Sequence, residues 1–62
     1  MTVGETVRLE TPTPNHAWTL ELVGEDGWVS EVTEKAVAVE GLLPGVLYFA
    51  PKQLISLERK AA

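Results

Sequence analysis

The sequence predicts a small all-β domain of five short strands, with one 3₁₀ turn before the last strand. Short stretches in which apolar and polar residues alternate recur along the chain, and turns rich in glycine or proline separate them. The chain has 62 residues, which corresponds to one domain. A domain of this size buries roughly 60% of its surface, so association with a partner is one way to reinforce it.

The first strand is expected over residues 6–11, after a turn at Gly4. Val7 and Leu9 alternate there with polar neighbours, which is typical of a strand with one buried face.

A loop is predicted over residues 11–16, where two prolines one residue apart restrict the backbone and make the loop stiff. Residues 17–23 alternate again, which indicates either a short strand or the extended arm of a long first loop. In either case Trp18, Leu20 and Leu22 share one face.

The second strand is predicted in the segment 24–32, after a turn that contains two glycines. Gly27 is expected to have either a positive φ or a neighbour packed where a Cβ atom would lie. Val29 and Val32 are three residues apart, so strict alternation would place them on opposite faces. A β-bulge near residues 30–31 would return both side chains to the core.

The remaining elements are predicted from valine and aromatic content, alternation and turn residues. They are a third strand over residues 36–40 with Val37 and Val39 inward, a turn over 41–45, a fourth strand over 46–50, a 3₁₀ turn over 51–54, a fifth strand over 55–58, and a flexible tail over 59–62.

The expected core consists of the apolar residues on the inward faces of these elements. They are Val3, Val7, Leu9, Leu20, Leu22, Val29, Val32, Val37, Val39, Leu47, Phe49, Leu54, Ile55 and Leu57.

Five large apolar residues are then left over and are the candidate partner-binding residues. Trp28 and Tyr48 each adjoin an inward residue of a strand, so both are expected to face outward. Trp18, at the end of the proline loop, and Leu42 and Leu43, in the turn after the third strand, complete the set. Clustered exposed aromatic residues mark partner surfaces, so a contiguous patch for a protein partner or for self-association is predicted. In the alternative, one Trp covers the end of the barrel and the two leucines fold back over the core.

No catalytic, metal or cofactor motif stands out, and no cofactor is expected. The chain has no Cys, which excludes disulfides and thiolate metal sites, and its single His cannot form a zinc site alone. His16 is interpreted as a solvated loop residue, and the Glu25-Asp26 pair as an exposed turn. Ser30 and Ser56 have no base nearby in the sequence.

The net charge of −4 opposes non-specific binding of nucleic acid and docking on anionic membranes. The acidic residues are interpreted as a solvated surface, and binding of a basic partner is the alternative. No apolar run approaches the roughly 20 residues of a membrane span, and the N-terminus does not have the pattern of a signal peptide. A cytoplasmic location is expected, since the chain has no Cys.

Three segments resemble small bacterial and photosynthetic SH3-like proteins. Residues 48–57 resemble the strand, 3₁₀ turn and strand that close SH3-like barrels, and residues 3–9 resemble the opening of the variable chain of ferredoxin:thioredoxin reductase and of the SH3-like protein of photosystem I. The glycine and valine spacing over 24–32 is similar to that in these proteins and in KOW domains. The resemblance implies a five-stranded SH3-like barrel that acts as an accessory component of a larger complex.

The expected function is accordingly a non-catalytic protein-interaction module or a small accessory subunit of a larger complex. One alternative is an enzyme that forms its site on oligomerisation, since the plasmid-borne type II dihydrofolate reductase has this architecture and a similar opening. Its pore motif contains a Gln, however, and the matching residues 46–49 here are Val-Leu-Tyr-Phe. A KOW-like nucleic-acid-binding module is the other alternative.

Overall fold

The computed structural model describes residues 1–57, and the predicted tail over 59–62 lies outside them. The elements are β1 (Thr6–Leu9), η1 (Ala17–Leu22), β2 (Asp26–Val32), β3 (Val37–Glu40), β4 (Val46–Phe49), η2 (Pro51–Gln53) and β5 (Leu54–Ser56), where η denotes a 3₁₀ helix.

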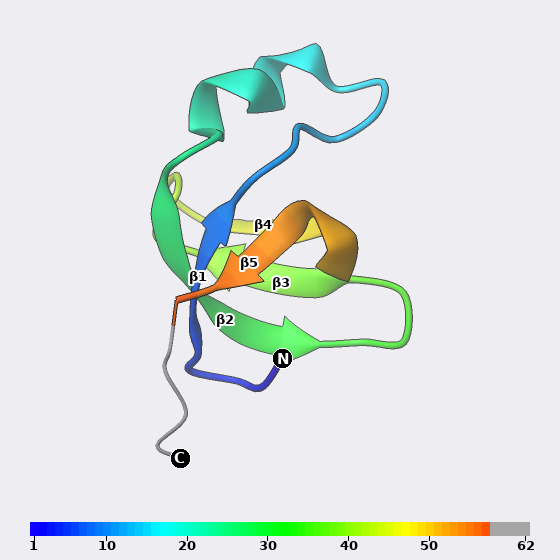
Figure 1. Ribbon diagram of the computed structural model, residues 1–62. Helices are drawn as coiled ribbons and strands as arrows, with labels where there is room; N and C mark the ends of the chain where they lie inside the picture. Colours follow the sequence, from blue (N-terminus) through cyan, green and yellow to red (C-terminus); the bar gives the residue numbers. More distant parts are fainter. Residues whose placement is uncertain (58–62) are drawn as a thin grey trace.

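The strands form one antiparallel sheet in the order β4-β3-β2-β1-β5 (Figure 1). The predicted all-β class, the number of strands and the 3₁₀ turn before the last strand are confirmed. The hydrogen-bonded sheet is open, with β4 and β5 at its two edges, so barrel closure remains a prediction. The helix η1 lies at the end of the molecule opposite the N-terminus.

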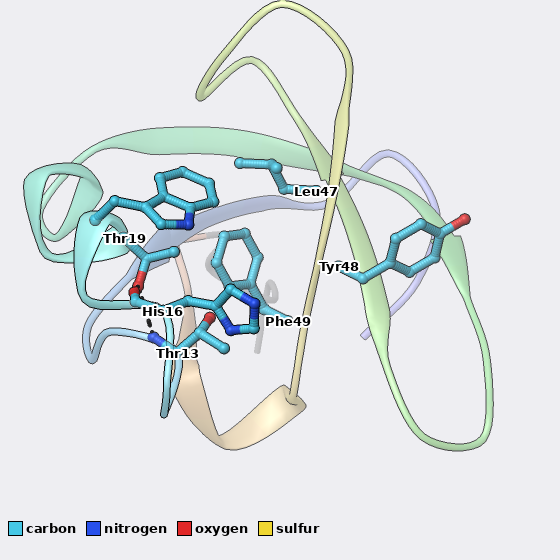
Figure 2. Close-up of a pocket in the computed structure, with 7 residues that line it drawn as sticks. Thr13, His16, Thr19, Leu47, Tyr48 and Phe49 are labelled. Carbon is cyan, nitrogen blue, oxygen red and sulfur yellow. Dashed lines mark hydrogen bonds between the residues drawn. The ribbon is translucent and has the colours of Figure 1, made fainter.

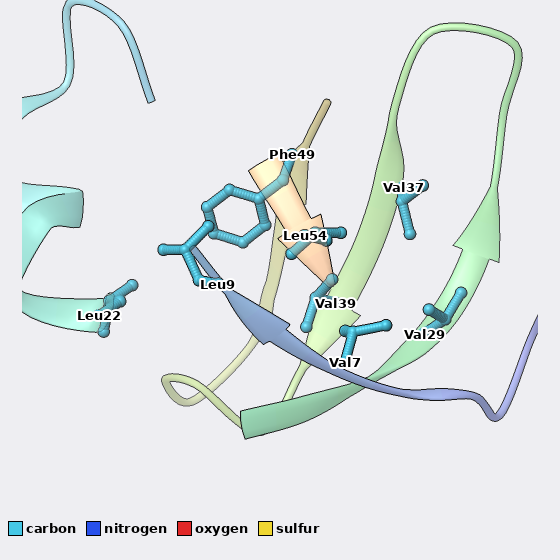
Figure 3. Packing of buried hydrophobic residues seen from close by; sticks show 8 residues of the cluster. All are labelled: Val7, Leu9, Leu22, Val29, Val37, Val39, Phe49 and Leu54. Atoms are coloured by element: carbon cyan, nitrogen blue, oxygen red, sulfur yellow. The ribbon is translucent and has the colours of Figure 1, made fainter. Parts of the chain in front are cut away.

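The core lies on the concave side of the sheet and is made of inward-facing residues from every strand. Figure 3 shows these side chains pointing toward one another from strands that are distant in sequence. The eight residues of the buried core cluster were all predicted: Val7, Leu9, Leu22, Val29, Val37, Val39, Phe49 and Leu54. Ala38 is buried as well and was not predicted.

The bulge predicted near Ser30 is present in β2. Val29 pairs with Val39 of β3, whereas the next pair is Glu31 with Ala38, so Ser30 is the extra residue. Because of the bulge, Val32 is on the same inward side of the sheet as Val29, and it pairs with the buried Val37. Val32 is nevertheless exposed because it ends the strand, so its assignment to the core was wrong.

Gly27 has a neighbour packed where a Cβ atom would lie, which is one of the two conditions expected for it. Its φ is not positive, and a Cβ atom there would clash with the backbone carbonyl oxygen of Glu40 and lie 2.9 Å from Cγ1 of Val39. The close approach of β2 and β3 at this point requires a residue without a side chain.

The segment 17–23 is not extended, contrary to the prediction. Residues Ala17–Leu22 form η1, and helical winding separates the side chains that alternation would have placed together. Leu22 packs into the core and Thr19 is buried, whereas Trp18 and Leu20 are exposed. The alternation of apolar residues over so short a span therefore did not distinguish a strand from a 3₁₀ helix.

Two further core assignments were wrong. Val3 is 68% exposed because it lies in the turn that precedes β1. The strand β5 starts at Leu54, one residue earlier than predicted, so Leu54 takes the inward position and Ile55, at 41% exposure, faces out. Of the other predicted core residues, Leu47 and Leu57 are half-buried.

Candidate functional site

The outer face of the sheet over β2, β3 and β4 carries large exposed apolar side chains. Trp28 of β2 pairs with Glu40 of β3, which in turn pairs with Val46 of β4, so the three residues form one row across the sheet. Trp28 is 50% exposed, and Val46 is exposed as well. The Trp28 ring lies over Gly41, where a Cβ atom would be 2.6 Å from Cζ3 of the indole.

A second row is formed by Glu31 of β2, Ala38 of β3 and Tyr48 of β4. The Tyr48 hydroxyl donates a hydrogen bond to Oε1 of Glu31 at 3.2 Å, and so spans the strand between them. Ala38 lies beneath and is 1% exposed although it is on the outer face. Tyr48 itself is 56% exposed. We call Trp28, Val46, Tyr48, Glu31 and Glu40 the outer patch.

The Glu31 contact also affects the ionisation of the phenol. The hydrogen bond to Glu31 and the negative charge of its carboxylate raise the pKa of Tyr48 above its ordinary value, because both favour the protonated form. The bulge at Ser30 is what places Glu31 on the outer face opposite Ala38. Bulges that direct a side chain in this way are common beside functional sites.

A pocket of about 170 Å³ lies between β4 and the loop that leads into η1. Leu47 and Phe49 project into it from β4, whereas the Tyr48 side chain points to the other side of the strand (Figure 2). The opposite wall comes from the loop and helix, and the pocket is lined by Thr13, His16, Trp18, Thr19, Leu47, Tyr48 and Phe49.

The loop wall of this pocket is held by two buried polar side chains that sequence reasoning missed. The Thr19 hydroxyl accepts a hydrogen bond from the Thr13 backbone N–H at 2.8 Å and donates one to the His16 carbonyl at 2.7 Å. Gln53 Oε1 accepts the Ala50 N–H at 2.8 Å. No buried side-chain polar atom of residues 1–57 lacks a hydrogen-bond partner.

Gln53 also connects η2 to the proline loop. Its Nε2 donates to Oγ1 of Thr13 at 3.0 Å and to the Thr11 carbonyl at 3.3 Å. A signal for Gln53 was present in the sequence, since Gln at the third position of a helix reaches back to the capping residue's N–H. Thr19 gave no such signal, because alternation assigned it to the exposed side of a strand.

Four of the five predicted partner-binding residues are exposed in the structure. Trp28 and Tyr48 face outward as predicted, and Trp18 is exposed and lines the pocket together with Tyr48. Leu42 is half-buried and packs against the core, as in the alternative considered for it. Leu43 is exposed in the turn between β3 and β4.

The other polar residues form ordinary surface contacts. Arg8 Nε donates to Asp26 Oδ1 at 2.7 Å, and this hydrogen bond with its ion pair lowers the pKa of Asp26. His16 is exposed, and its Nδ1 lies 3.3 Å from the Pro14 carbonyl oxygen. Among residues 1–57 no three His, Cys, Asp or Glu side chains gather closely enough to hold a metal ion. The same residues include no helix long and apolar enough to cross a membrane.

Comparison with known proteins gave no match to a family model, to a curated protein or to a solved structure. The functional argument therefore depends on the geometry of the outer patch and the neighbouring pocket.

Proposed function

We propose that this protein is a non-catalytic protein-interaction module or small accessory subunit that binds its partner through the outer patch. The observation that carries the proposal is the exposure of three large apolar side chains, Trp28, Val46 and Tyr48, in two rows on the outer face of β2, β3 and β4. The strand order and the 3₁₀ turn before β5 support the proposed likeness to SH3-like accessory proteins.

The composition of the outer patch is that of a binding surface more than that of a solvated one. Aromatic residues supply much of the binding energy in protein interfaces, and burial of apolar surface contributes about 25 cal/mol per Å². Tyr48 is also held in place by Glu31, so less side-chain freedom is lost when a partner covers it. An exposed patch of this kind, fixed on strands of a sheet, is suited to recognition of another protein.

The test is the double substitution Trp28→Ser with Tyr48→Ser. We expect the variant to fold, because both side chains are outward, and to lose association in sedimentation and in affinity capture from the native host. The matched control is Val3→Ser with Leu20→Ser, which removes two exposed apolar side chains outside the patch. Equal association of both variants and the unmodified protein would rule out the outer patch as the binding surface.

A further inference from the structure

We propose that the partner segment is an extended peptide that adds to the free edge of β4, with cationic side chains on its outer side and an apolar side chain in the pocket. The inference rests on the proposed function and specifies the chemistry of the partner. It comes from three independent features of the described residues: the edge of β4, the pocket beside it and the acidic side chains of the outer patch.

The edge of β4 is available for strand addition. Within residues 1–57, β4 pairs only with β3, so the backbone groups on its other side have no strand partner. Residues Val46–Phe49 carry no charge, although edge strands are commonly protected by charged side chains or proline. An extended peptide added there gains main-chain hydrogen bonds, and the pockets beside it select its side chains.

The inner side of an added strand faces the pocket. Side chains of a strand alternate between two faces, so every second residue of the peptide lies on the side of Leu47 and Phe49. The pocket volume is about 170 Å³. A cavity of about 150 Å³ holds benzene, whereas cofactor and drug sites are usually about 300–1,000 Å³. The pocket therefore fits a single ring or branched aliphatic side chain.

The outer side of the peptide faces Tyr48 and the acidic residues beyond it. Glu31 and Glu40 lie on this face, and neither forms an ion pair with another residue of the described chain. The Tyr48 ring, fixed by Glu31, presents an aromatic surface of the kind that attracts Lys and Arg side chains. Charge complementarity thus favours a cationic residue at the outward positions.

A second copy of this chain fits the site less well. The β4 segment of another molecule offers no cation to Glu31 and Glu40, because Val46–Phe49 is uncharged. Each copy also carries a net charge of −4, which opposes close approach of two molecules. We therefore assign the edge to a basic, extended segment of a different protein.

The probe is the synthetic peptide Lys-Thr-Lys-Phe-Lys-Thr-Lys, in which lysines occupy one face of a strand and phenylalanine the other. We expect it to shift the amide resonances of Val46–Phe49, protect them from hydrogen exchange, and shift the indole N–H resonance of Trp18 beside the pocket. Three control peptides separate the contributions: one with glutamates in place of lysines, one with alanine in place of phenylalanine, and one N-methylated at alternate residues to remove the donors that face β4. Each control is expected to bind more weakly than the probe.

Charge variants of the protein test the outer side. Glu31→Gln and Glu40→Gln should each weaken binding by up to about fivefold, the upper range for exposed ion pairs. Glu25→Gln makes the same charge change in the turn before β2 and should leave the affinity unchanged. The folded state of every variant is checked by its amide spectrum.

Three results would overturn the inference. They are N-methylated and unmodified peptides that bind equally, a peptide that leaves the β4 resonances unperturbed, and dimers of the protein alone that protect β4. The proposed function is tested separately by the Trp28→Ser, Tyr48→Ser variant. If that variant loses association while the peptide does not bind, the outer patch stands as the binding surface and only the peptide chemistry is wrong.

Discussion

Substitution of Gly27 by alanine tests the register of β2 against β3. The Cβ atom of an alanine at this position would clash with the Glu40 carbonyl oxygen and lie 2.9 Å from Cγ1 of Val39. That separation is at least about 0.6 Å shorter than the optimal carbon–carbon distance of roughly 3.5–4.0 Å. Val39 is buried in the core, so neither contact is relieved by a side chain moving into solvent.

The expected cost follows from the rigidity of both neighbours. Overpacking of a well-packed site costs typically about 1–3 kcal/mol. A domain of this length has a total stability of about 3–9 kcal/mol, so the substitution removes a substantial part of it. A loss of about 1 kcal/mol corresponds to a decrease of about 4–8 °C in Tm for a domain this small.

The assay is urea denaturation monitored by tryptophan fluorescence. The free energies of unfolding are compared between variants that have the same m-value, the dependence of this free energy on urea concentration. Gly45→Ala gives a comparison in which no neighbouring atom is contacted, because Gly45 has a φ of +101° and nothing lies within 4 Å of the position of its Cβ. The cost of Gly45→Ala therefore comes from backbone strain alone, whereas the cost of Gly27→Ala comes from contacts with β3. An unchanged free energy of unfolding for Gly27→Ala would refute the close approach of β2 and β3.

Substitutions at three other residues probe the core, the loop and the outer patch. Phe49→Ala should cost about 3–5 kcal/mol and leave most of the chain unfolded by circular dichroism, whereas the milder Phe49→Leu should retain a cooperative transition. Gln53→Leu should cost about 1–3 kcal/mol in denaturation, because the partly buried Ala50 N–H loses its acceptor. Gln53→Glu keeps an acceptor oxygen, and a smaller loss for it than for Gln53→Leu would support this assignment. Glu31→Gln should lower the pKa of Tyr48 toward its ordinary value in an absorbance titration, which reports on this residue alone because the chain has one Tyr. Since the folded pKa is raised, the stabilisation from this contact is present below the unfolded pKa of about 10 and is lost as the pH rises through the folded value.

The sheet could be predicted from the sequence because its strands follow simple rules. Valines at alternate positions predicted β3 and its inward face. The three-residue spacing of Val29 and Val32 predicted the bulge that is found at Ser30. The outward orientation of Trp28 and Tyr48 then followed from the alternation of side chains along a strand, because each adjoins an inward residue. These inferences required only the two-residue period of a strand.

The candidate site could be predicted only in part, since its components come from segments without that period. The residues of η1 alternate in the sequence but wind into a 3₁₀ helix, so the positions of Thr19 and Trp18 relative to β4 were not deducible. The pocket depends on this placement. The pairing of Tyr48 with Glu31 was likewise hidden, because it requires the register across β3 as well as the bulge.

The pocket remains open because hydrogen bonds, rather than apolar packing, hold its loop wall. Thr19 and Gln53 together bind the backbone at Thr11, Thr13 and His16, and they fix the loop without filling the space beside β4. The loop and η1 contribute only one side chain, Leu22, to the buried core cluster. Had the loop been anchored by large apolar residues, these would occupy the volume next to the sheet edge. A loop held by polar contacts therefore leaves both the pocket and the backbone of β4 accessible to a peptide.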